Sequence, residues 1–448
     1  MKVLFLEIDT EQTWGVASLG PAFIAPFLRR DGHEVAMMRV AAGAPLQDVV
    51  RAIRDAAPSI LGLSLTTRQW LRARDVVRAV RAVLDVPVIA GGLHPTFAPE
   101  EVLATPGFDY VCLGEGEEPM RDLLRALETK GRVPVLGKPI SNIWVKGGLR
   151  PPLRPPIEPL DAMPFIARDL LDEKYGVVQM TTQRGCPFPC TYCAARMYDE
   201  LYEGTGDYGR RRSHENVLAE INELRSRGQV NYITFLDDTF TLHHPWVRGY
   251  CKLHREQANI PFSIHARVET VNQDLLEHLA SAGCKHIVYG VESGSERVRR
   301  EILKRPVTNQ RFVDVFRWTR AVGINVVANY MLGIPGETRA DVEETLALHD
   351  QLLPDDFGYF VFYPYPGTHL FKLCKEKGYL PDDYLDLPAV HRASILNLPD
   401  LGKDDIAELY DRFTALRARD YLCRSGARLG ERDKQSLIEY LHGAAAVS

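Results

Sequence analysis

The 448-residue chain lacks long hydrophobic runs and lacks a strong excess of either charge. No stretch of about 18 apolar residues occurs, and the start MKVLFLEID carries acids instead of a basic flank and a cleavage site. The sequence therefore predicts neither a membrane span nor a secretory signal, and we expect a cytoplasmic protein. The formal net charge of −5 excludes a general electrostatic grip on nucleic acid or anionic lipid, so small-molecule partners are expected.

Cysteine is also scarce, with eight residues in the whole chain. Five of them show no pair spacing, and a reducing cytosol disfavours a disulfide framework, so we interpret these five as ordinary buried or surface residues. They are Cys112, Cys251, Cys284, Cys374 and Cys423. The remaining three, Cys186, Cys190 and Cys193, stand together in RGCPFPCTYC.

The first 130 residues alternate apolar runs with amphipathic stretches, which predicts an α/β, doubly wound, Rossmann-like domain over 1–130. Ligands of such sheets bind at the carboxyl ends of the strands. Glycines and small hydroxyl residues follow three of the expected strands, and together they favour a ligand-binding face over simple tight turns. The strands are expected at Lys2–Glu7, Glu34–Val40, Ile60–Leu65, Pro87–Gly91 and Asp109–Leu113.

Three further regions follow. Eight prolines between 134 and 164 predict an extended linker over 131–175. Six strand–helix units then predict a partial (β/α)6 barrel over 176–384, with its active residues at the carboxyl ends of the strands. Residues 385–448 are expected to form a helical C-terminal region, with helices near 403–420 and 431–443.

Three cysteines separated by three and then two residues can wrap one [4Fe-4S] cube from a single loop, which leaves the fourth iron open to a ligand. A structural zinc site would need a fourth ligand and usually pairs its cysteines two by two. The motif Cys186-x3-Cys190-x2-Cys193, with Tyr192 before the last cysteine, resembles that of the radical S-adenosylmethionine (SAM) superfamily. The resemblance covers residues 176–375.

The resemblance implies that the open iron binds SAM, whose reductive cleavage gives methionine and a 5′-deoxyadenosyl radical. It also implies SAM contacts at the strand ends. Asp237 or Asp238 would bind the methionine ammonium, unless these acids only cap the next helix. Arg267 would face the carboxylate or ribose, unless it pairs with a neighbouring acid. Tyr192 is a further implied SAM contact, Glu292 and Ser293 are implied contacts to the ribose, and Ile334 is the implied backbone contact to adenine.

The N-terminal domain resembles the cobalamin-binding domain of the B12-dependent radical SAM enzymes, because Gly-Gly-x-His-Pro-Thr and Gly-Glu-Gly-Glu follow its fourth and fifth strands. The cobalamin contacts implied by this match are Ser64, Thr66, Thr67, Arg68, Gly91, Gly92, His94, Pro95, Glu115 and Gly116. His94 is expected to hold the edge or tail of the corrin and not to ligate cobalt.

The Asp-x-His-x-x-Gly motif that supplies a cobalt-ligating histidine in many cobalamin proteins is absent after the first strand, where Ile8–Gly15 contains no histidine. We therefore expect cobalamin without a histidine lower ligand. The segment after the third strand would lie beneath the corrin, and Arg68 or Trp70 would shield the metal from water.

Together the two resemblances imply a methyltransferase. SAM would supply a methyl group through methylcobalamin to a substrate radical, at an unactivated carbon or, as the second choice, phosphorus of a small molecule or peptide. A cobalamin-dependent cyclase or ring-rearranging enzyme is the alternative, and a non-enzymatic cobalamin sensor or carrier would have no use for the cysteine loop. An electron donor such as flavodoxin or ferredoxin is the expected partner.

Overall fold

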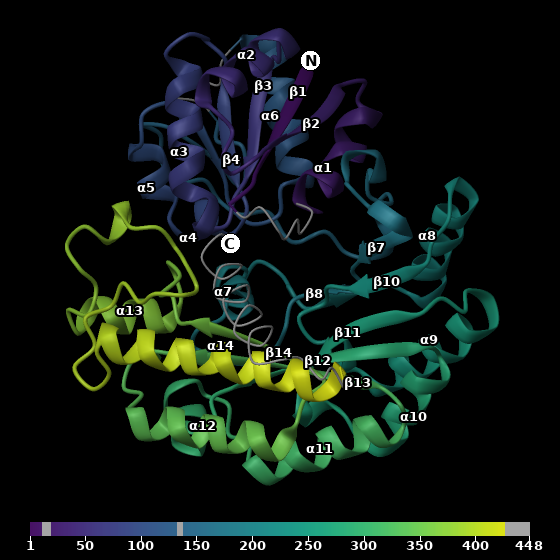
Figure 1. Cartoon of the computed structure of the whole chain (residues 1–448). Helices are drawn as coiled ribbons and strands as arrows, with labels where there is room; N and C mark the ends of the chain where they lie inside the picture. The colour runs from purple at the N-terminus through teal and green to yellow at the C-terminus, as the bar shows by residue number, and fades with distance from the viewer. Residues whose placement is uncertain (11–18, 132–137, 426–448) are drawn as a thin grey trace. The chain divides into compact units, whose positions relative to one another are not determined.

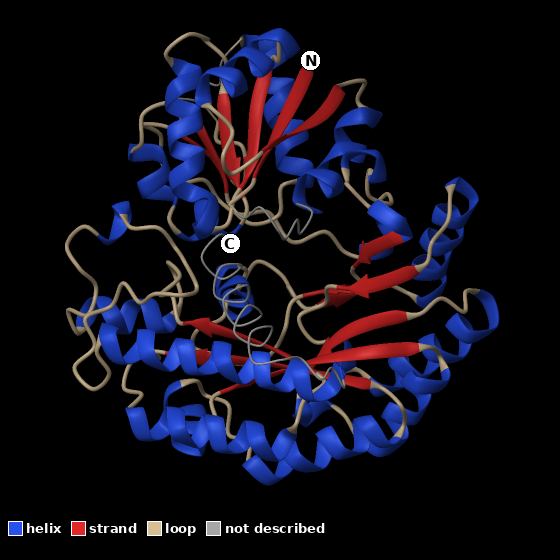
Figure 2. Ribbon diagram, in the orientation of Figure 1, coloured by secondary structure: helices blue, strands red, loops and turns tan. Residues whose placement is uncertain are grey.

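The computed structural model describes residues 1–10, 19–131 and 138–425, which form two compact units (Figure 1). One unit comprises Met1–Asp172 together with Met197–Tyr208, and the other comprises Glu173–Arg196 and the described chain from Gly209 onward. Each unit is built on its own six-stranded sheet with helices packed on it (Figure 2). The predicted α/β class is confirmed in both units.

The sheet of the N-terminal unit has the strand order β2-β1-β3-β4-β5-β6, and its first five strands are parallel. Its central strands are buried on both faces, which is why they read as continuous apolar runs such as ILGL. The strands are β1 Lys2–Ile8, β2 Glu34–Val40, β3 Ile60–Ser64, β4 Val88–Gly91, β5 Tyr110–Cys112 and β6 Ile143–Val145. The helices are α1 Leu19–Arg30, α2 Leu46–Ala56, α3 Thr67–Arg81, α4 Leu93–Phe97, α5 Pro99–Ala104 and α6 Glu117–Lys130.

The segment 131–175 differs from the linker that its prolines predict. Strand β6 pairs antiparallel with β5, with Val145 opposite Tyr110, and the N-terminal unit extends to Asp172. Asn142, just before β6, is fully buried, and its side-chain amide donates to the Leu113 carbonyl at 2.7 Å. A three-residue strand between prolines has too little periodicity to be recognised in sequence, so only its pairing reveals it.

The sheet of the second unit has the order β14-β13-β12-β11-β10-β7, and all of its pairings are parallel. This arrangement confirms the expected partial barrel. The strands are β7 Val177–Met180, β10 Tyr232–Phe235, β11 Phe262–Ala266, β12 Cys284–Glu292, β13 Asn325–Leu332 and β14 Asp356–Val361. The main helices are α8 His214–Arg227, α9 His244–Gln257, α10 Gln273–Ser281, α11 Asn309–Ala321, α12 Arg339–Leu352 and α13 His369–Glu376.

The expected C-terminal helix near 403–420 is present as α14, Lys403–Ser425, and it lies against the barrel sheet. Buried polar contacts hold it there: the Tyr359 hydroxyl lies 2.7 Å from the Thr414 hydroxyl, and His349 Nε2 lies 2.8 Å from Asp420. The second expected helix, 431–443, lies outside the described residues. No helix within the described ranges combines the length and apolar character that a membrane crossing requires.

Candidate functional site

The three clustered cysteines lie in the loop between β8 (Gln183–Arg184) and α7 (Ala194–Leu201), which follows the first barrel strand. Cys186 and Cys190 are buried, and Cys193 is half-buried. The Thr191 hydroxyl donates to the carbonyl of Ile302 at 2.7 Å, so the loop is fixed to the segment that follows β12. The sequence prediction that the loop lies at the carboxyl edge of the barrel sheet is therefore met.

The chemistry of these thiols fits a multi-iron cluster. Burial raises the pKa of Cys193 to about 12, and the negative charges of Asp238, Cys190 and Cys186 add to that rise. A bound metal centre would supply the positive charge that keeps such thiols deprotonated. Within the described ranges, no three His, Cys, Asp or Glu side chains gather as they would around a single metal ion. A cube surrounds four irons instead of one atom, so its ligands are spaced more widely.

The two adjacent aspartates after β10 have different surroundings. Asp237 Oδ1 accepts from the backbone amides of Thr182 and Gln183 at 2.7 and 2.8 Å, and its Oδ2 accepts from the Thr182 hydroxyl at 3.1 Å. Asp237 therefore holds the end of β7. Asp238 is more exposed, and its charge raises the pKa of both Cys186 and Cys193. Of the two acids, Asp238 is the one placed to meet a ligand beside the cysteine loop.

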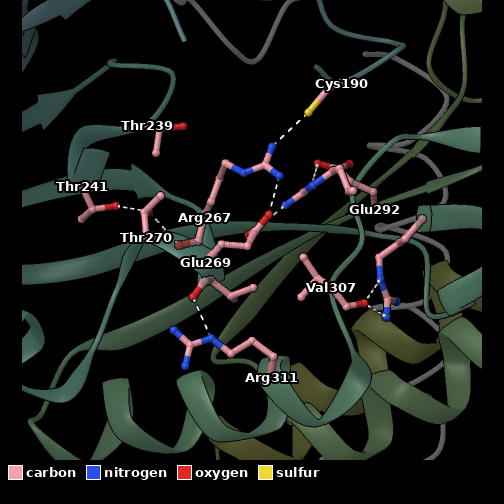
Figure 3. Close-up of polar contacts among 12 residues, drawn as sticks. Cys190, Thr239, Thr241, Arg267, Glu269, Thr270, Glu292, Val307 and Arg311 are labelled. Atoms are coloured by element: carbon pink, nitrogen blue, oxygen red, sulfur yellow. Dashed lines mark hydrogen bonds and ion pairs between the residues drawn. The ribbon is translucent and has the colours of Figure 1, made fainter. Parts of the chain in front are cut away.

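Arg267 follows β11 and is buried, with 8% of its surface exposed. Its Nη1 donates to Cys190 Sγ at 2.9 Å, and its Nη2 donates to Glu269 Oε1 (Figure 3). The guanidinium also stacks on the Phe188 ring, 3.8 Å from the ring centroid. The sequence left two alternatives for Arg267, a contact to SAM or a pair with a neighbouring acid, and the structure shows the pair with an acid together with a contact to the cysteine loop.

Glu292 ends β12 in the left-handed region, with φ of +69°, next to a break in the β12–β13 register. Its Oε1 accepts from the Tyr192 hydroxyl at 3.0 Å and from Arg305 Nη1 at 3.1 Å. A Cβ on Gly290 would lie 2.2 Å from Glu292 Oε1, so only glycine leaves room for this carboxylate. Tyr192 and Glu292 are thus brought together, as the resemblance implies, by a strained strand end.

Ser293 and Ile334 are fully buried and face the protein interior. The Ser293 hydroxyl lies 3.5 Å from the Thr345 hydroxyl of α12. The Ile334 amide donates to Glu337 Oε2 at 3.2 Å, and its carbonyl accepts from the Glu337 amide at 2.8 Å. The structure therefore shows these residues shaping the loops after β12 and β13.

In the N-terminal unit, the strand order reverses between β1 and β3, and the carboxyl ends of strands flanking such a point are where open α/β sheets bind ligands. Ser64 ends β3 at this point. Gly91 ends β4, and Gly92 follows with φ of +90°, so close to the chain that a Cβ would lie 2.8 Å from the Leu65 amide. These glycines bring two strand ends together and fit a ligand that covers the edge of the sheet. The loop 11–18 after β1, where a lower-ligand histidine is sought, lies outside the described residues.

Several of the residues after β3 and β4 cap a helix or pack in the core of the N-terminal unit. Thr66 caps α3, and its amide donates to Gln69 Oε1 at 2.8 Å, so the helix starts at Thr67. His94 is 2% exposed, stacks on Trp70 at 4.8 Å and lies 3.4 Å from the Thr67 hydroxyl through Nδ1. Trp70, expected with Arg68 as an alternative shield for the metal, is 3% exposed and packs against His94 and Phe108. Pro95 is buried beside His94, and Arg68 is half-buried on the first turn of α3.

The loop after β5 contacts the segment Met197–Tyr208 within the same unit. The Glu115 amide donates to the Tyr202 hydroxyl at 2.8 Å, and Glu115 Oε2 accepts from the Ile157 amide at 3.0 Å. Gly116 immediately precedes α6, and a Cβ placed on it would lie only 3.0 Å from the Ile24 side chain. Tyr202 is 1% exposed and stacks on Tyr208 at 5.4 Å. Tyr202 and Tyr208 therefore pack within the N-terminal unit.

Two family models match the chain: the radical SAM superfamily over residues 180–349 and the B12-binding domain over residues 16–124. An uncharacterized methyltransferase from Pyrococcus horikoshii is 31% identical over 79% of this chain and 77% of its own length. The chain belongs to the cobalamin-dependent radical SAM enzymes.

Other relatives of this radical SAM enzyme differ in their reactions. The cytidylyl-2-hydroxyethylphosphonate methyltransferase of Streptomyces wedmorensis is 24% identical over 91% of this chain and 86% of its own length. The anaerobic magnesium-protoporphyrin IX monomethyl ester cyclase of Rubrivivax gelatinosus is 26% identical over 80% of this chain and 66% of its own length.

Two solved structures share the fold of the chain. The radical SAM methyltransferase TsrM from Kitasatospora setae aligns with a TM-score of 0.69 and 17% identity, over 84% of this chain and 75% of that one. The cobalamin-dependent radical SAM enzyme OxsB aligns with a TM-score of 0.73 and 17% identity, over 99% of this chain and 71% of that one. At this identity the likeness concerns the fold.

Three residues of the site are absent from the sequence prediction: Arg305, Glu337 as an anchor, and Tyr202 as a backbone acceptor. Arg305 is 2% exposed and reaches Glu292 at 3.1 Å. Glu337 is 1% exposed, and its Oε2 accepts from the Gly333 amide at 2.7 Å. For Arg305 and Glu337 a charged residue in an apolar neighbourhood is the only sequence signal, and surface residues give the same signal. A tyrosine gives no signal of a bond to a backbone amide, so the contacts alone identify all three.

Proposed function

We propose that this radical SAM enzyme is a cobalamin-dependent methyltransferase that acts on a carbon or, as the second choice, a phosphorus centre of a small molecule or peptide. The observation that carries the proposal is a three-cysteine loop at the carboxyl edge of a barrel sheet, in one chain with a B12-binding unit. Cofactors of both kinds are needed for methyl transfer by this route. When bound, the cluster supplies the electron that cleaves SAM, and cobalamin carries the methyl group.

The chain's own residues would divide the work around the cluster. Cys186, Cys190 and Cys193 would hold three irons, and the exposed acid Asp238 would bind the ammonium of SAM beside the open iron. Tyr192 and Glu292 form a half-buried polar pair that can bind ribose hydroxyls, since Glu292 keeps a second carboxylate oxygen.

Cobalamin would lie on the carboxyl edge of the N-terminal sheet. Ser64 ends β3 beside the point where the strand order reverses, Gly91 and Gly92 lie at the end of the next strand β4, and the Gly114–Gly116 loop follows the neighbouring strand β5. His94 remains an interior residue, because its ring is stacked in the core and burial lowers its pKa to about 3. We therefore propose that cobalamin binds without a histidine from this loop.

Transfer of label from SAM tests the proposal without knowledge of the substrate. The holoenzyme is incubated anaerobically with a chemical reductant and SAM labelled on its methyl group, and products are separated by chromatography. A methyltransferase places label on the bound cobalamin and releases S-adenosylhomocysteine in equal amount. Release of 5′-deoxyadenosine with no label on cobalamin overturns methyl transfer.

A cyclase or ring-rearranging activity is the second candidate, because the Rubrivivax relative is named a cyclase. The same experiment separates the two, since such an enzyme cleaves SAM but does not take its methyl group. In either case the cluster needs an external one-electron donor, and we propose a small redox protein of the flavodoxin or ferredoxin type. Replacing the chemical reductant by such a protein and its reductase should sustain SAM cleavage.

A further inference from the structure

Arg267 contacts the cysteine loop directly through its charged guanidinium. It follows Ala266, the last residue of β11, so its backbone position is fixed by the sheet. Two residues of the loop contact its guanidinium: Cys190 Sγ lies 2.9 Å from Nη1, and the Phe188 ring centroid lies 3.8 Å from Cζ. Cys190 is the second cluster cysteine, and Phe188 lies in the short segment between it and Cys186, the first.

The same guanidinium is also balanced by an acid. Its Nη2 donates to Glu269 Oε1, and Glu269 Oε2 lies 3.8 Å from Arg305 Nη2 (Figure 3). Two buried arginines and one partly exposed carboxylate therefore stand in a row beside Cys190. The planar face of Arg267 rests on Phe188 and its edge binds the sulfur and the carboxylate, so little of the group is left for SAM.

The contact with sulfur has an electrostatic consequence. An N–H donor with a full positive charge stabilises a thiolate, and it stabilises the cluster most when an added electron makes that cluster more negative. Hydrogen bonds to the ligating sulfurs, net charge and solvent exposure set the reduction potentials of iron–sulfur clusters. Arginine keeps its charge at any physiological pH, so this contribution is permanent.

We propose that Arg267 is a positioning residue that fixes the cysteine loop and raises the reduction potential of the cluster bound there, instead of contacting SAM. The inference rests on the cluster assignment of the proposed function. Glu269 offsets part of the charge, so the pair sets the potential together. Phe188 contributes the stacking surface that orients the guanidinium.

The test is an anaerobic redox titration of the reconstituted holoenzyme, followed through the electron paramagnetic resonance signal of the reduced cluster. Arg267→Gln removes the charge and should shift the midpoint potential to a more negative value. Arg267→Lys retains the charge and should restore most of the wild-type potential. Glu269→Gln removes the balancing acid and should shift the potential in the positive direction, with Arg267→Gln/Glu269→Gln lying between the two single variants.

One control variant and three further outcomes distinguish failure of the inference from failure of the proposed function. Phe188→Leu removes the stacking but leaves the charge, so it should lower the iron retained per chain while shifting the potential less than Arg267→Gln does. If Arg267→Gln retains no cluster, a positive shift in Glu269→Gln together with a near-wild-type potential in Arg267→Lys supports the inference, and an unchanged potential in Glu269→Gln contradicts it. An unchanged potential in Glu269→Gln and Arg267→Gln, with SAM binding weakened at least tenfold in the latter, overturns the inference. A wild-type protein with no cluster signal overturns the proposed function itself.

Discussion

The carboxyl-terminal edges of the parallel strands in the two sheets carry different kinds of residue. The edge of the N-terminal sheet carries glycines, hydroxyls and backbone amides, and its histidine is stacked in the core. The edge of the barrel sheet carries buried charges, with Arg267, Arg305 and Glu292 gathered around one thiol. The first edge suits recognition of a large ligand by shape, and the second suits control of charge.

The difference follows from what each edge does with its polar groups. In the N-terminal unit, polar side chains such as Thr66 and Thr67 satisfy the chain itself, so the surface left for a ligand is mostly backbone. In the barrel unit, arginines and acids form ion pairs with one another, and burying them costs desolvation free energy. Such a cost is expected where charge matters to the chemistry. Variants that damage one edge and spare the other test this contrast.

The largest expected effect is that of Cys190→Ala. Loss of one of three cluster ligands should reduce SAM cleavage to an undetectable level, while the visible spectrum shows cobalamin still bound to the N-terminal unit. Iron content and 5′-deoxyadenosine release are the measurements. Cys251→Ala, which removes a buried thiol from α9, is the matched control and should keep both SAM cleavage and cobalamin binding. SAM cleavage that persists in Cys190→Ala contradicts the role of the loop.

Arg305→Met should destabilise the barrel unit strongly. It leaves Glu292 buried without its cation, and breaking a buried pair costs about 3–5 kcal/mol. Chemical denaturation of the cluster-free protein measures the loss, and Arg305→Met/Glu292→Gln should recover part of it. The exposed pair of Arg300 and Glu301 gives the control, because Arg300→Met should change the free energy of unfolding by less than about 1 kcal/mol. Equal losses at Arg300 and Arg305 would refute the buried network.

Gly92→Ala should damage the other edge. The new Cβ would lie 2.8 Å from the Leu65 amide at a φ of +90°, so backbone strain and overpacking together cost about 3 kcal/mol. Cobalamin affinity should fall at least tenfold, because the ends of β3 and β4 must separate. Gly147→Ala is the matched control: its φ is +78° and no atom lies within 4 Å, so only the strain remains. Equilibrium binding of cobalamin to both variants checks this, and similar affinities would count against a ligand at this edge.

The last expected effect, the smallest when counted per pH unit, is a pH dependence from Glu337. Burial raises the pKa of its carboxyl from 4.5 to about 8, so the folded protein keeps a proton that the unfolded chain has released between these values. The free energy of unfolding should therefore decrease as the pH rises from about 4.5 to 8, by at most about 1.4 kcal/mol per pH unit.

Glu337→Gln should remove that part of the slope, since its amide oxygen can accept the same amide hydrogens from Gly333 and Ile334. Denaturation at several pH values in cluster-free protein gives the measurement. The exposed Glu301→Gln should leave the slope unchanged. A slope that persists in Glu337→Gln would show that another group titrates.

Much of the fold could be predicted from local sequence. The spacing of apolar residues located the strands of both sheets to within a few residues, because burial on both faces leaves continuous apolar runs. Strand β6 escaped prediction, since three residues between prolines carry no period. For the site, sequence identified the cysteine loop and named Tyr192 and Glu292 as separate expected SAM contacts, yet it could not separate Asp237 from Asp238. One accepts three hydrogen bonds from the end of β7, and the other faces the loop.

The sequence by itself determined the three-cysteine loop, because covalent spacing alone brings Cys186, Cys190 and Cys193 within reach of one cluster. The tertiary structure alone decided what surrounds that loop. Arg267 lies 77 residues from Cys190 in the chain, and Arg305 lies 113 residues from Tyr192. Contacts at such separations depend on strand register and on the left-handed turn at Glu292, and neither leaves a local pattern in the sequence.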